Sequence, residues 1–291
     1  MTTFLRNYKF PNTGWKYYKQ YYDMNVGTTI QDINNSIFNT VILEIPALIN
    51  DPDLKFDAVT TYPGLVIGTG YTHEKKDDDH AFKIGFFFDY TSGMPIIPGS
   101  SVKGVLRSAF PQRIIVPKKV VTNQLEKENW IKEILEQKCG ITGDVDIDEL
   151  EREIFDGLRK EPYQQNKARV AIQPVPVYER DIFFDAVPIE ITANNIGHSK
   201  QLLGSDYITP HKNKDRNLPE LDPFSNPNPL KFLKIMPSVK IEFRFKLEDS
   251  VIIPALNLKN KIILFREIIT TLGIGAKTNV GYGQFETLIN E

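Results

Sequence analysis

Two segments far apart in the chain combine glycines, hydroxyl groups and cations in patterns that suit phosphate binding. In the segment that ends at Arg107, Ser100 and Ser101 precede a run of apolar residues at helical spacing, and Lys103 lies one turn before Arg107. A helix N-terminus presents unpaired backbone N–H groups to an anion, and the two cations add positive charge. The segment therefore predicts a phosphate contact, and a capped, solvent-exposed helix is the alternative.

The second segment, GIGAKTNVGYG at residues 273–283, places four glycines around Lys277 and Thr278. A glycine-rich loop lets backbone N–H groups face an anion. The segment is not a nucleotide-binding P-loop, because Ala276 stands where that motif requires glycine and because the loop follows an expected helix and enters an expected strand. We therefore expect contacts to a polynucleotide phosphate rather than ATP binding, with an ordinary turn as the alternative.

Two acidic segments suggest metal binding at first sight. The loop 73–80 contains Asp77, Asp78 and Asp79 between two histidines, but its HEKKD sequence does not match the HExxH zinc motif. The segment 144–148 begins like a calcium-binding loop, yet it lacks the required glycine and the final glutamate of that motif. We interpret the first as a solvated loop and the second as an acidic helix start, and we expect no metal and no cofactor.

No residue combination indicates a catalytic nucleophile. His198 and His211 lack the neighbouring serine and carboxylate spacing of a triad. Cys139 lies at the end of an expected acidic helix, which should raise the pKa of its thiol.

The N-terminal segment is rich in aromatic residues. Residues 1–22 contain eight of them, interleaved with four cations: Phe4, Tyr8, Phe10, Trp15, Tyr17, Tyr18, Tyr21 and Tyr22. Such a segment could stack on nucleobases. The alternative, which we favour, is an arm that packs its rings on the body of the protein or on a partner subunit.

Composition excludes several classes of protein. The 291 residues include 35 basic and 37 acidic side chains and a single cysteine, so a disulfide framework is impossible and a reducing, cytoplasmic location is expected. No segment has the length and apolarity of a membrane span or a signal peptide. The net charge of −2 conceals segregation, because residues 126–161 hold 12 acids and 6 bases while residues 98–120 hold five bases and no acid.

The hydrophobic pattern predicts a mixture of strands and helices. Alternating apolar and charged residues over 239–247 indicate a strand with one solvent-exposed face, and residues 58–70, 169–178, 182–192 and 285–289 are also strand-like. Helical spacing occurs over 102–110, 126–138, 148–160 and 260–272. Residues 206–231 are rich in Pro, Asn, Asp and Lys and predict a long loop.

Two of these segments together resemble motifs of the RAMP superfamily of type III CRISPR effector subunits. IPGSSVKGVLR at 97–107 is similar to the family's Pro-Gly-Ser-Ser-x-Lys-Gly-x-x-Arg helix start, and GIGAKTNVGYGQF at 273–285 is similar to its C-terminal glycine-rich loop. Segments 68–70, 184–188 and 208–211 more particularly resemble the type III-B Cmr-module subunit conventionally numbered six. The resemblance begins near residue 58 and does not cover residues 1–57 or 126–161.

The resemblance implies an α+β fold with a ferredoxin-like (RRM-like) core that carries helical and loop insertions. We expect a single RAMP-type domain over 1–291, with an aromatic-rich extension at 1–57, a helical insertion at 121–161 and a long polar loop at 198–232. In this fold a glycine-rich loop and a sheet face handle single-stranded RNA.

The resemblance also implies a function, namely a guide-RNA-binding structural subunit that caps the 3′-end side of a type III-B CRISPR ribonucleoprotein targeting invader RNA. Expected partners are guide RNA, target RNA, backbone RAMP subunits, a small helical subunit and a second capping RAMP subunit, and no membrane. The residues implied to meet RNA are Ser100, Ser101, Lys103 and Arg107 at the helix, and Gly275, Lys277, Thr278, Gly281, Tyr282 and Gly283 in the loop. We expect Lys103 and Lys277 to share one cationic groove, and sequence specificity to come from base pairing between RNAs.

The alternative is a RAMP-fold endoribonuclease, either a target-cleaving backbone subunit or a repeat-processing enzyme. In backbone subunits an aspartate in the loop before the Pro-Gly-Ser-Ser helix supports cleavage, and Asp77, Asp78 and Asp79 occupy a comparable loop. Repeat-processing enzymes usually lack that helix motif. The resemblance to a capping subunit implies that this chain is not itself an enzyme.

Overall fold

The computed structural model describes residues 12–21, 28–43, 54–68, 80–111, 123–160, 172–192, 200–209 and 229–287. The aspartates at 77–79, the histidines at 198 and 211, and the aromatic residues before Asn12 lie outside the described residues. Within the described ranges, no helix is both long enough and apolar enough to cross a membrane.

The central sheet has the connectivity of a ferredoxin-like fold. Six elements make up this core and occur along the chain in the following order, with insertions between them: β1 (Lys55–Thr60), α3 (Gly99–Ser108), β5 (Val187–Ile191), β8 (Val239–Lys246), α6 (Leu258–Leu272) and β9 (Phe285–Thr287). In space β5 pairs with β8, β8 with β1 and β1 with β9, all antiparallel. A short strand, β4 (Ile182–Phe183), also pairs with β8. The expected α+β fold with a ferredoxin-like core is therefore confirmed.

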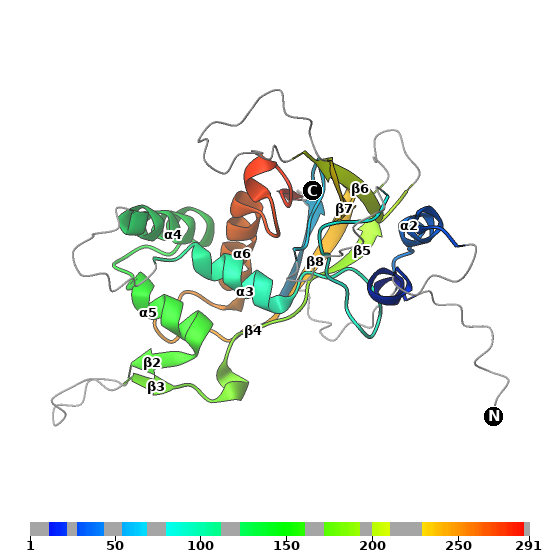
Figure 1. Cartoon of the computed structure of the whole chain (residues 1–291). Helices are drawn as coiled ribbons and strands as arrows, with labels where there is room; N and C mark the ends of the chain where they lie inside the picture. Colours follow the sequence, from blue (N-terminus) through cyan, green and yellow to red (C-terminus); the bar gives the residue numbers. More distant parts are fainter. Residues whose placement is uncertain are drawn as a thin grey trace, which may run out of the picture.

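Helices α3 and α6 cover one face of this sheet (Figure 1). Alternate residues of a strand share a face, and Phe243 and Phe245 of β8 both point to the helices. Phe243 stacks on Phe56 of β1 with ring centroids 4.9 Å apart, and Phe245 contacts Phe265 of α6 at 5.3 Å. All four rings are buried. Large aromatic side chains therefore fix the helices on the sheet.

The other face of the sheet carries charged side chains that pair with one another. Glu242 of β8 accepts hydrogen bonds from Lys55, at 2.6 Å, and from Arg244. Lys240 pairs with Glu190 of β5. Glu242 and Arg244 are buried, so the prediction that this side of the strand is solvent-exposed is wrong over its middle. Because these cations are neutralised within the sheet, this face does not offer the open platform that RRM sheets present to RNA.

The expected helical insertion contains two helical segments, and the second ends earlier than predicted. Helix α4 spans Asn123–Cys139, and α5 (Ile147–Glu151) continues as a π-helix, η3 (Arg152–Asp156). Gly157 then has a φ of 61°, a left-handed conformation that glycine adopts readily at helix ends. The next residues form β2 (Leu158–Lys160), which pairs with β3 (Ile172–Pro174). The predicted continuation of the helix to residue 160 is therefore wrong.

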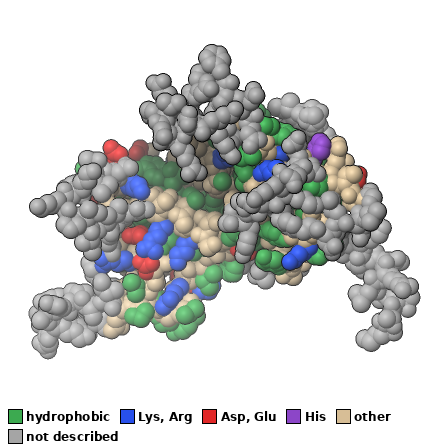
Figure 2. Space-filling model, viewed as in Figure 1, with side chains coloured by type: hydrophobic (Ala, Val, Ile, Leu, Met, Phe, Trp, Pro, Cys, Tyr) green, Lys and Arg blue, Asp and Glu red, His purple; other side chains and the backbone are tan. Residues whose placement is uncertain are grey.

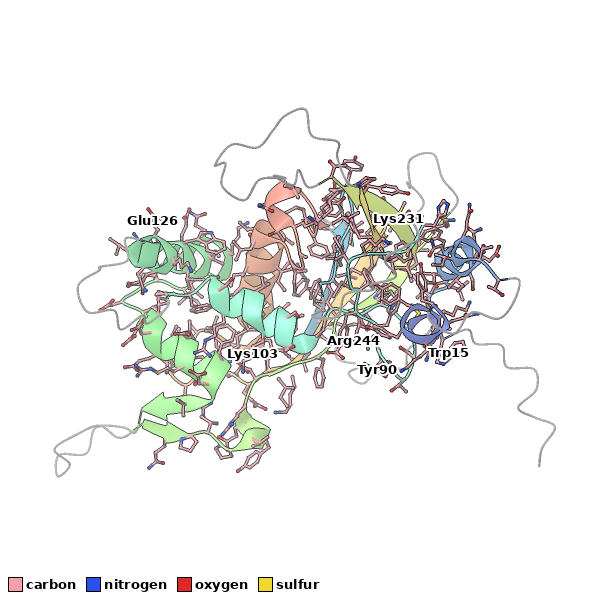
Figure 3. The ribbon with its side chains drawn as sticks, viewed as in Figure 1. Trp15, Tyr90, Lys103, Glu126, Lys231 and Arg244 are labelled. Carbon is pink, nitrogen blue, oxygen red and sulfur yellow. The ribbon has the colours of Figure 1, made fainter. Side chains whose placement is uncertain are left out.

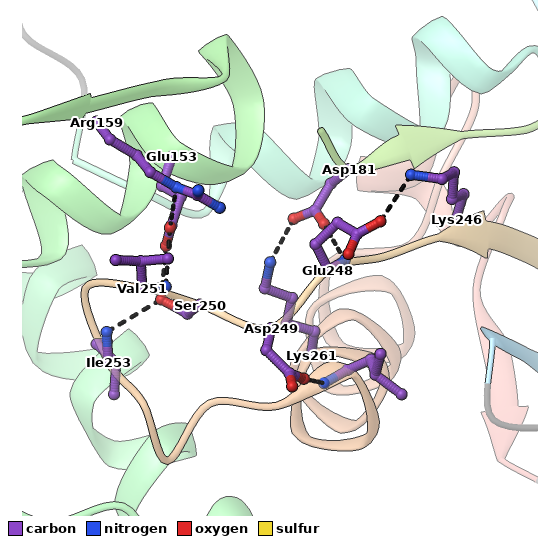
Figure 4. Close-up of polar contacts among 11 residues, drawn as sticks. Glu153, Arg159, Asp181, Lys246, Glu248, Asp249, Ser250, Val251, Ile253 and Lys261 are labelled. Carbon is purple, nitrogen blue, oxygen red and sulfur yellow. Dashed lines mark hydrogen bonds and ion pairs between the residues drawn. The ribbon is translucent and has the colours of Figure 1, made fainter. Parts of the chain in front are cut away.

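Buried polar contacts lie within this insertion, between it and the core, and between β4 and α6 (Figure 4). Glu153 of η3 accepts hydrogen bonds from Arg159 at 2.8 Å and from Ser250 at 2.5 Å. Asp181, beside β4, pairs with Lys261 of α6 at 2.6 Å, and both side chains are only 2% exposed. Burying a charge is costly unless it has a partner. These pairs therefore restrict how the insertion and the helices can be placed on the sheet.

Part of the expected polar loop is a strand pair. Strands β6 (Leu203–Ile208) and β7 (Leu230–Ile235) pair antiparallel over their full length, so the prediction of a loop is wrong at both ends, while residues 210–228 lie outside the described residues. The hairpin connects to the core through a bridge between Leu65 and Ile235. Figure 1 shows β6 and β7 on the side of the sheet away from α3 and α6.

The N-terminal helices lie beside this hairpin (Figure 1). They are α1 (Thr13–Trp15), a π-helix η1 (Lys16–Gln20) and α2 (Ile30–Phe38), and the remaining short helices of the described chain are η4 (Val177–Glu179) and η5 (Thr278–Val280). Tyr17 and Tyr21 are fully buried, with ring centroids 6.1 and 5.9 Å from that of Phe82. The interpretation of this segment as a packing arm is confirmed for these two rings.

Candidate nucleic-acid interface

Helix α3 begins one residue before the predicted caps. Its first residue is Gly99, which approaches β4 so closely that a Cβ there would lie 2.2 Å from the Phe183 carbonyl oxygen. The Gly99 N–H donates to the Asp185 carboxylate at 2.7 Å. Ser100 and Ser101 are exposed on the first turn and are not the N-cap. Because Asp185 already places a negative charge at this helix end, a phosphate here would meet a carboxylate.

The two cations of α3 have different surroundings. The ammonium group of Lys103 lies 5.9 Å from the centroid of the Phe183 ring. Arg107 donates from Nε to Glu151 at 2.8 Å and from both terminal nitrogens to Asp156 at 2.8 and 2.9 Å. The hydrogen bonds that Arg107 donates to Asp156 are the main cause of an Arg107 pKa above its usual value. Arg107 therefore connects α3 to the helical insertion, and Figure 2 shows acidic and basic side chains mixed over this region.

Replacing Arg107 with Ala is expected to lower the free energy of unfolding by about 1–3 kcal/mol, because the buried Glu151 carboxylate loses its donor. RNA affinity of the full chain should stay within twofold of wild type. Urea denaturation and RNA titration measure the two effects, and Lys132→Ala, which removes a partly exposed lysine of α4, is the control. An Arg107→Ala protein of unchanged stability that binds RNA more weakly would show that Arg107 contacts RNA directly.

The glycine-rich loop connects α6 to β9 and closes on the segment that follows β1. Ala276 N–H donates to the Val66 carbonyl at 2.8 Å, and Gly283 N–H donates to the Gly64 carbonyl at 2.8 Å. A Cβ on Gly275 would lie 2.4 Å from the Val66 carbonyl oxygen. Lys277 itself has a φ of 63°. The loop therefore has a fixed conformation that presents Lys277, with Thr278 beginning the short η5 helix.

Tyr282 supports this loop from beneath. Its side chain is buried, and its hydroxyl donates to the Asp206 carboxylate at 2.7 Å. Lys234 donates to the same carboxylate oxygen at 2.7 Å. Burial raises the pKa of Asp206, but the hydrogen bonds from Lys234 and Tyr282 lower it, and the net pKa lies below its usual value. Burial and the Asp206 carboxylate raise the pKa of Tyr282. Tyr282 thus holds the loop on β6 and does not present its ring for stacking.

Lysines and exposed rings from five segments lie on or beside the glycine-rich loop and the two faces of the neighbouring β6–β7 strand pair. We call this set the basic–aromatic surface, and it consists of Tyr62, Lys83, Tyr207, Lys231 and Lys277. Lys231 Nζ lies 5.9 Å from the Tyr207 ring, and the Lys231 carbonyl accepts the Lys83 backbone N–H at 2.7 Å. Tyr62 and Tyr207 are 84% and 53% exposed. Figure 2 shows basic side chains beside hydrophobic ones over this hairpin.

The position of Tyr62 follows from the chain around it. Its neighbour Pro63 lies against Gly281, where a Cβ would be 3.4 Å from the proline Cδ. Lys277 Nζ lies 5.9 Å from the Phe232 ring, which itself contacts Tyr282. Four members of the surface, all except Lys277, were missed from the sequence. Four of the six residues in LKFLKI at 230–235 are apolar, and this short apolar-rich run was a signal that could have revealed the strand.

Lys103 and Lys277 lie at different ends of the core sheet. Phe183, beneath Lys103, pairs with Phe245 near the C-terminal end of β8. The glycine-rich loop packs just beyond Thr60 of β1, whose hydroxyl accepts the Val239 N–H at the other end of β8. Six strand residues span about 20 Å. The register therefore separates the two cations too far for the single groove expected from the sequence.

The remaining candidates from the sequence are a metal site and the Cys139 thiol. Among the described residues, no group of three or more His, Cys, Asp or Glu side chains could hold a metal ion. Cys139 ends α4, and burial, with a contribution from Glu267, raises the pKa of its thiol to about 11. The expected direction of this shift is confirmed, although burial rather than the acidic helix is its main cause.

Three solved structures are similar to this chain. A chain of the type III-B Cmr-beta complex bound to cognate target RNA is 22% identical with a TM-score of 0.46, and the alignment covers 80% of this chain but only 57% of that one. Cmr6 from Pyrococcus furiosus is 23% identical with a TM-score of 0.39, covering 81% of this chain and 97% of that one. A chain of a type III-A Csm–crRNA–target RNA complex is 13% identical with a TM-score of 0.31, covering 75% and 74%.

No curated protein is significantly similar to this chain in sequence. A family model, in contrast, matches most of its length. The model of the RAMP superfamily matches residues 57–286, which include the whole ferredoxin-like core, helix α3 and the glycine-rich loop. This chain belongs to the RAMP superfamily.

Proposed function

We propose that this chain is an RNA-binding structural subunit of a type III-B CRISPR ribonucleoprotein, in which it caps the 3′-end side of the guide RNA. Membership of the RAMP superfamily supports the class of protein. The basic–aromatic surface is the observation that carries the proposal. Its Lys277 lies on the glycine-rich loop, one of the two motifs through which the sequence resembles type III effector subunits.

The chemistry of this surface suits single-stranded RNA. Lysine side chains neutralise phosphates, and exposed rings stack on unpaired bases of any identity. Lys277 and Lys231 lie over rings, and no carboxylate of the described residues is paired with either, whereas Lys234 is paired with Asp206. Guide RNAs differ in sequence, so contacts to phosphates and ring faces are the appropriate kind. The contact of Ser100, Ser101 and Lys103 with guide phosphates remains a prediction.

Replacing Lys231 and Lys277 together with Ala is expected to weaken RNA binding and its salt dependence. Each lost phosphate contact lowers the slope of log K against log salt by about 0.7 for a single strand, so the double variant should lose about 1.4. Fluorescence anisotropy of a labelled single-stranded RNA, titrated with the full chain at several salt concentrations, measures this slope. In the assembled complex the same variant should retain less guide RNA.

The control is Lys132→Ala, which removes a partly exposed lysine of α4 that pairs with Glu128. This variant should keep the wild-type slope. A double variant at Lys231 and Lys277 that binds RNA with wild-type affinity and slope would contradict the proposed interface.

A further inference from the structure

The exposed part of the N-terminal aromatic segment lines a small pocket. Its volume is about 130 Å³, and it is formed by Asn12, Gly14, Trp15, Tyr18, Lys19, Asp89 and Tyr90. Trp15 is 57% exposed and Tyr90 is 77% exposed, in contrast to the buried rings of Tyr17 and Tyr21. Figure 3 shows Trp15 and Tyr90 on the same side of the molecule as Lys231. The pocket is separate from the glycine-rich loop.

Hydrogen bonds hold two walls of this pocket in place. The Tyr18 hydroxyl donates to the Phe86 carbonyl at 2.8 Å and accepts the Phe88 N–H at 3.2 Å. The Asn12 amide accepts the Trp15 N–H at 2.7 Å and donates to the Tyr90 carbonyl at 3.3 Å. A site whose walls are already ordered loses little entropy when a ligand binds.

The pocket therefore offers ring faces to a ligand more than hydrogen-bonding groups. The Tyr18 and Tyr90 rings are stacked, with centroids 5.9 Å apart and planes 23° apart. The Tyr18 hydroxyl and the Asn12 amide are occupied within the chain, and the Asp89 carboxylate accepts the Ser92 N–H at 2.6 Å. A flat, apolar-faced ring matches these walls.

Two observations favour a nucleobase over a peptide side chain. Proline-rich peptides in aromatic grooves need donors for their carbonyl groups, and here the Tyr18 hydroxyl and one N–H of the Asn12 amide already donate within the chain. The exposed Lys19 at the rim suits the phosphate attached to a base and repels a cationic side chain.

We propose that this pocket binds one unpaired nucleobase of single-stranded RNA, which stacks on Tyr90 and Trp15 while Lys19 faces its phosphate. The proposal rests on the proposed RNA-binding function and adds a second contact to it. The segment 83–90 connects the two surfaces along the chain, because the Lys83 backbone N–H donates to the Lys231 carbonyl while Asp89 and Tyr90 line the pocket. One strand of RNA can thus follow this segment from the basic–aromatic surface to the pocket.

The fluorescence of Trp15 provides a direct test. The chain has two tryptophans, so Trp130→Phe leaves Trp15 as the only one. A 12-nucleotide single-stranded RNA should quench its emission, since a stacked base quenches indole, whereas inorganic polyphosphate, which has no bases, should not. Tyr90→Ala should weaken RNA binding about 5- to 100-fold, the range of a lost base–ring stack, while Tyr90→Phe keeps the ring and should bind normally.

Tyr178→Ala is the matched control, because Tyr178 is 72% exposed on η4 but lies outside both surfaces. RNA that binds by anisotropy without changing Trp15 emission would overturn this inference and leave the proposed function intact. RNA that does not bind to the full chain or to the assembled complex would overturn both. Tyr90→Ala that binds RNA normally but fails to join the complex would assign the pocket to a protein partner and also overturn the inference.

Discussion

Replacing Asp181 with Ala is expected to lower the free energy of unfolding by about 3–5 kcal/mol, because the change leaves a buried ammonium group without a partner. The Lys261 and Asp181 side chains are both 2% exposed and are 2.6 Å apart. Lys261 Nζ donates to one oxygen of the Asp181 carboxylate, and the Glu248 backbone N–H donates to the other. Urea denaturation with an unchanged m-value measures the loss as a lower midpoint.

Two controls separate burial from charge in this experiment. Glu128→Ala breaks a partly exposed i,i+4 pair with Lys132 and should cost only about 0.3–0.5 kcal/mol. The double change Asp181→Leu with Lys261→Met removes both charges and should recover much of the lost stability. An Asp181→Ala protein no less stable than Glu128→Ala would refute the idea that this pair is buried in solution.

Replacing Gly283 with Ala is expected to cost more than about 2 kcal/mol and to distort the loop that presents Lys277. Gly283 has a φ of 68°, and a left-handed conformation costs a residue with a Cβ about 1–2 kcal/mol. In addition, the new Cβ would lie 1.9 Å from the Ile274 carbonyl oxygen, so backbone atoms must move. Chemical denaturation and RNA titration of the same protein measure both effects.

Gly104→Ala is the matched control for this substitution. Gly104 lies in α3, and a Cβ there would meet no atom within 4 Å. Alanine favours the helix over glycine by about 0.5–1 kcal/mol, so this variant should be more stable than wild type. If both alanine variants had the same stability, the close packing of the loop would be disproved.

The elements with strong patterns could be predicted from the sequence. Alternation identified β8, and helical spacing followed by Gly273 identified α6 and its end. The β6–β7 hairpin could not be found in this way, because Asp206 and Lys234 look like loop residues until they pair across the two strands. Local polarity conceals a strand when its charges are neutralised by a strand more than twenty residues away.

Only part of the candidate site could be predicted from the sequence, for the same reason. The glycine-rich loop is a local pattern, and its Lys277 could be recognised from the sequence alone. Arg107 was interpreted as a phosphate ligand because its partners, Glu151 and Asp156, are 44 and 49 residues away. Tyr62, Tyr207 and Lys231 come from separate segments, so only the fold brings them beside the loop. Residue type could be predicted, whereas pairing depends on tertiary structure.

The position of β1 has a consequence for how the protein is made. Strand β1 lies between β8 and β9, so both of its partners are synthesised after residue 238. A nascent chain therefore carries an unpaired central strand while nearly two hundred further residues are added, and such open edges favour aggregation. The sheet can close only once the C-terminal strand has left the ribosome. The core sheet is consequently completed only after residue 287 has been synthesised, and truncations that remove β9 are expected to accumulate as insoluble protein.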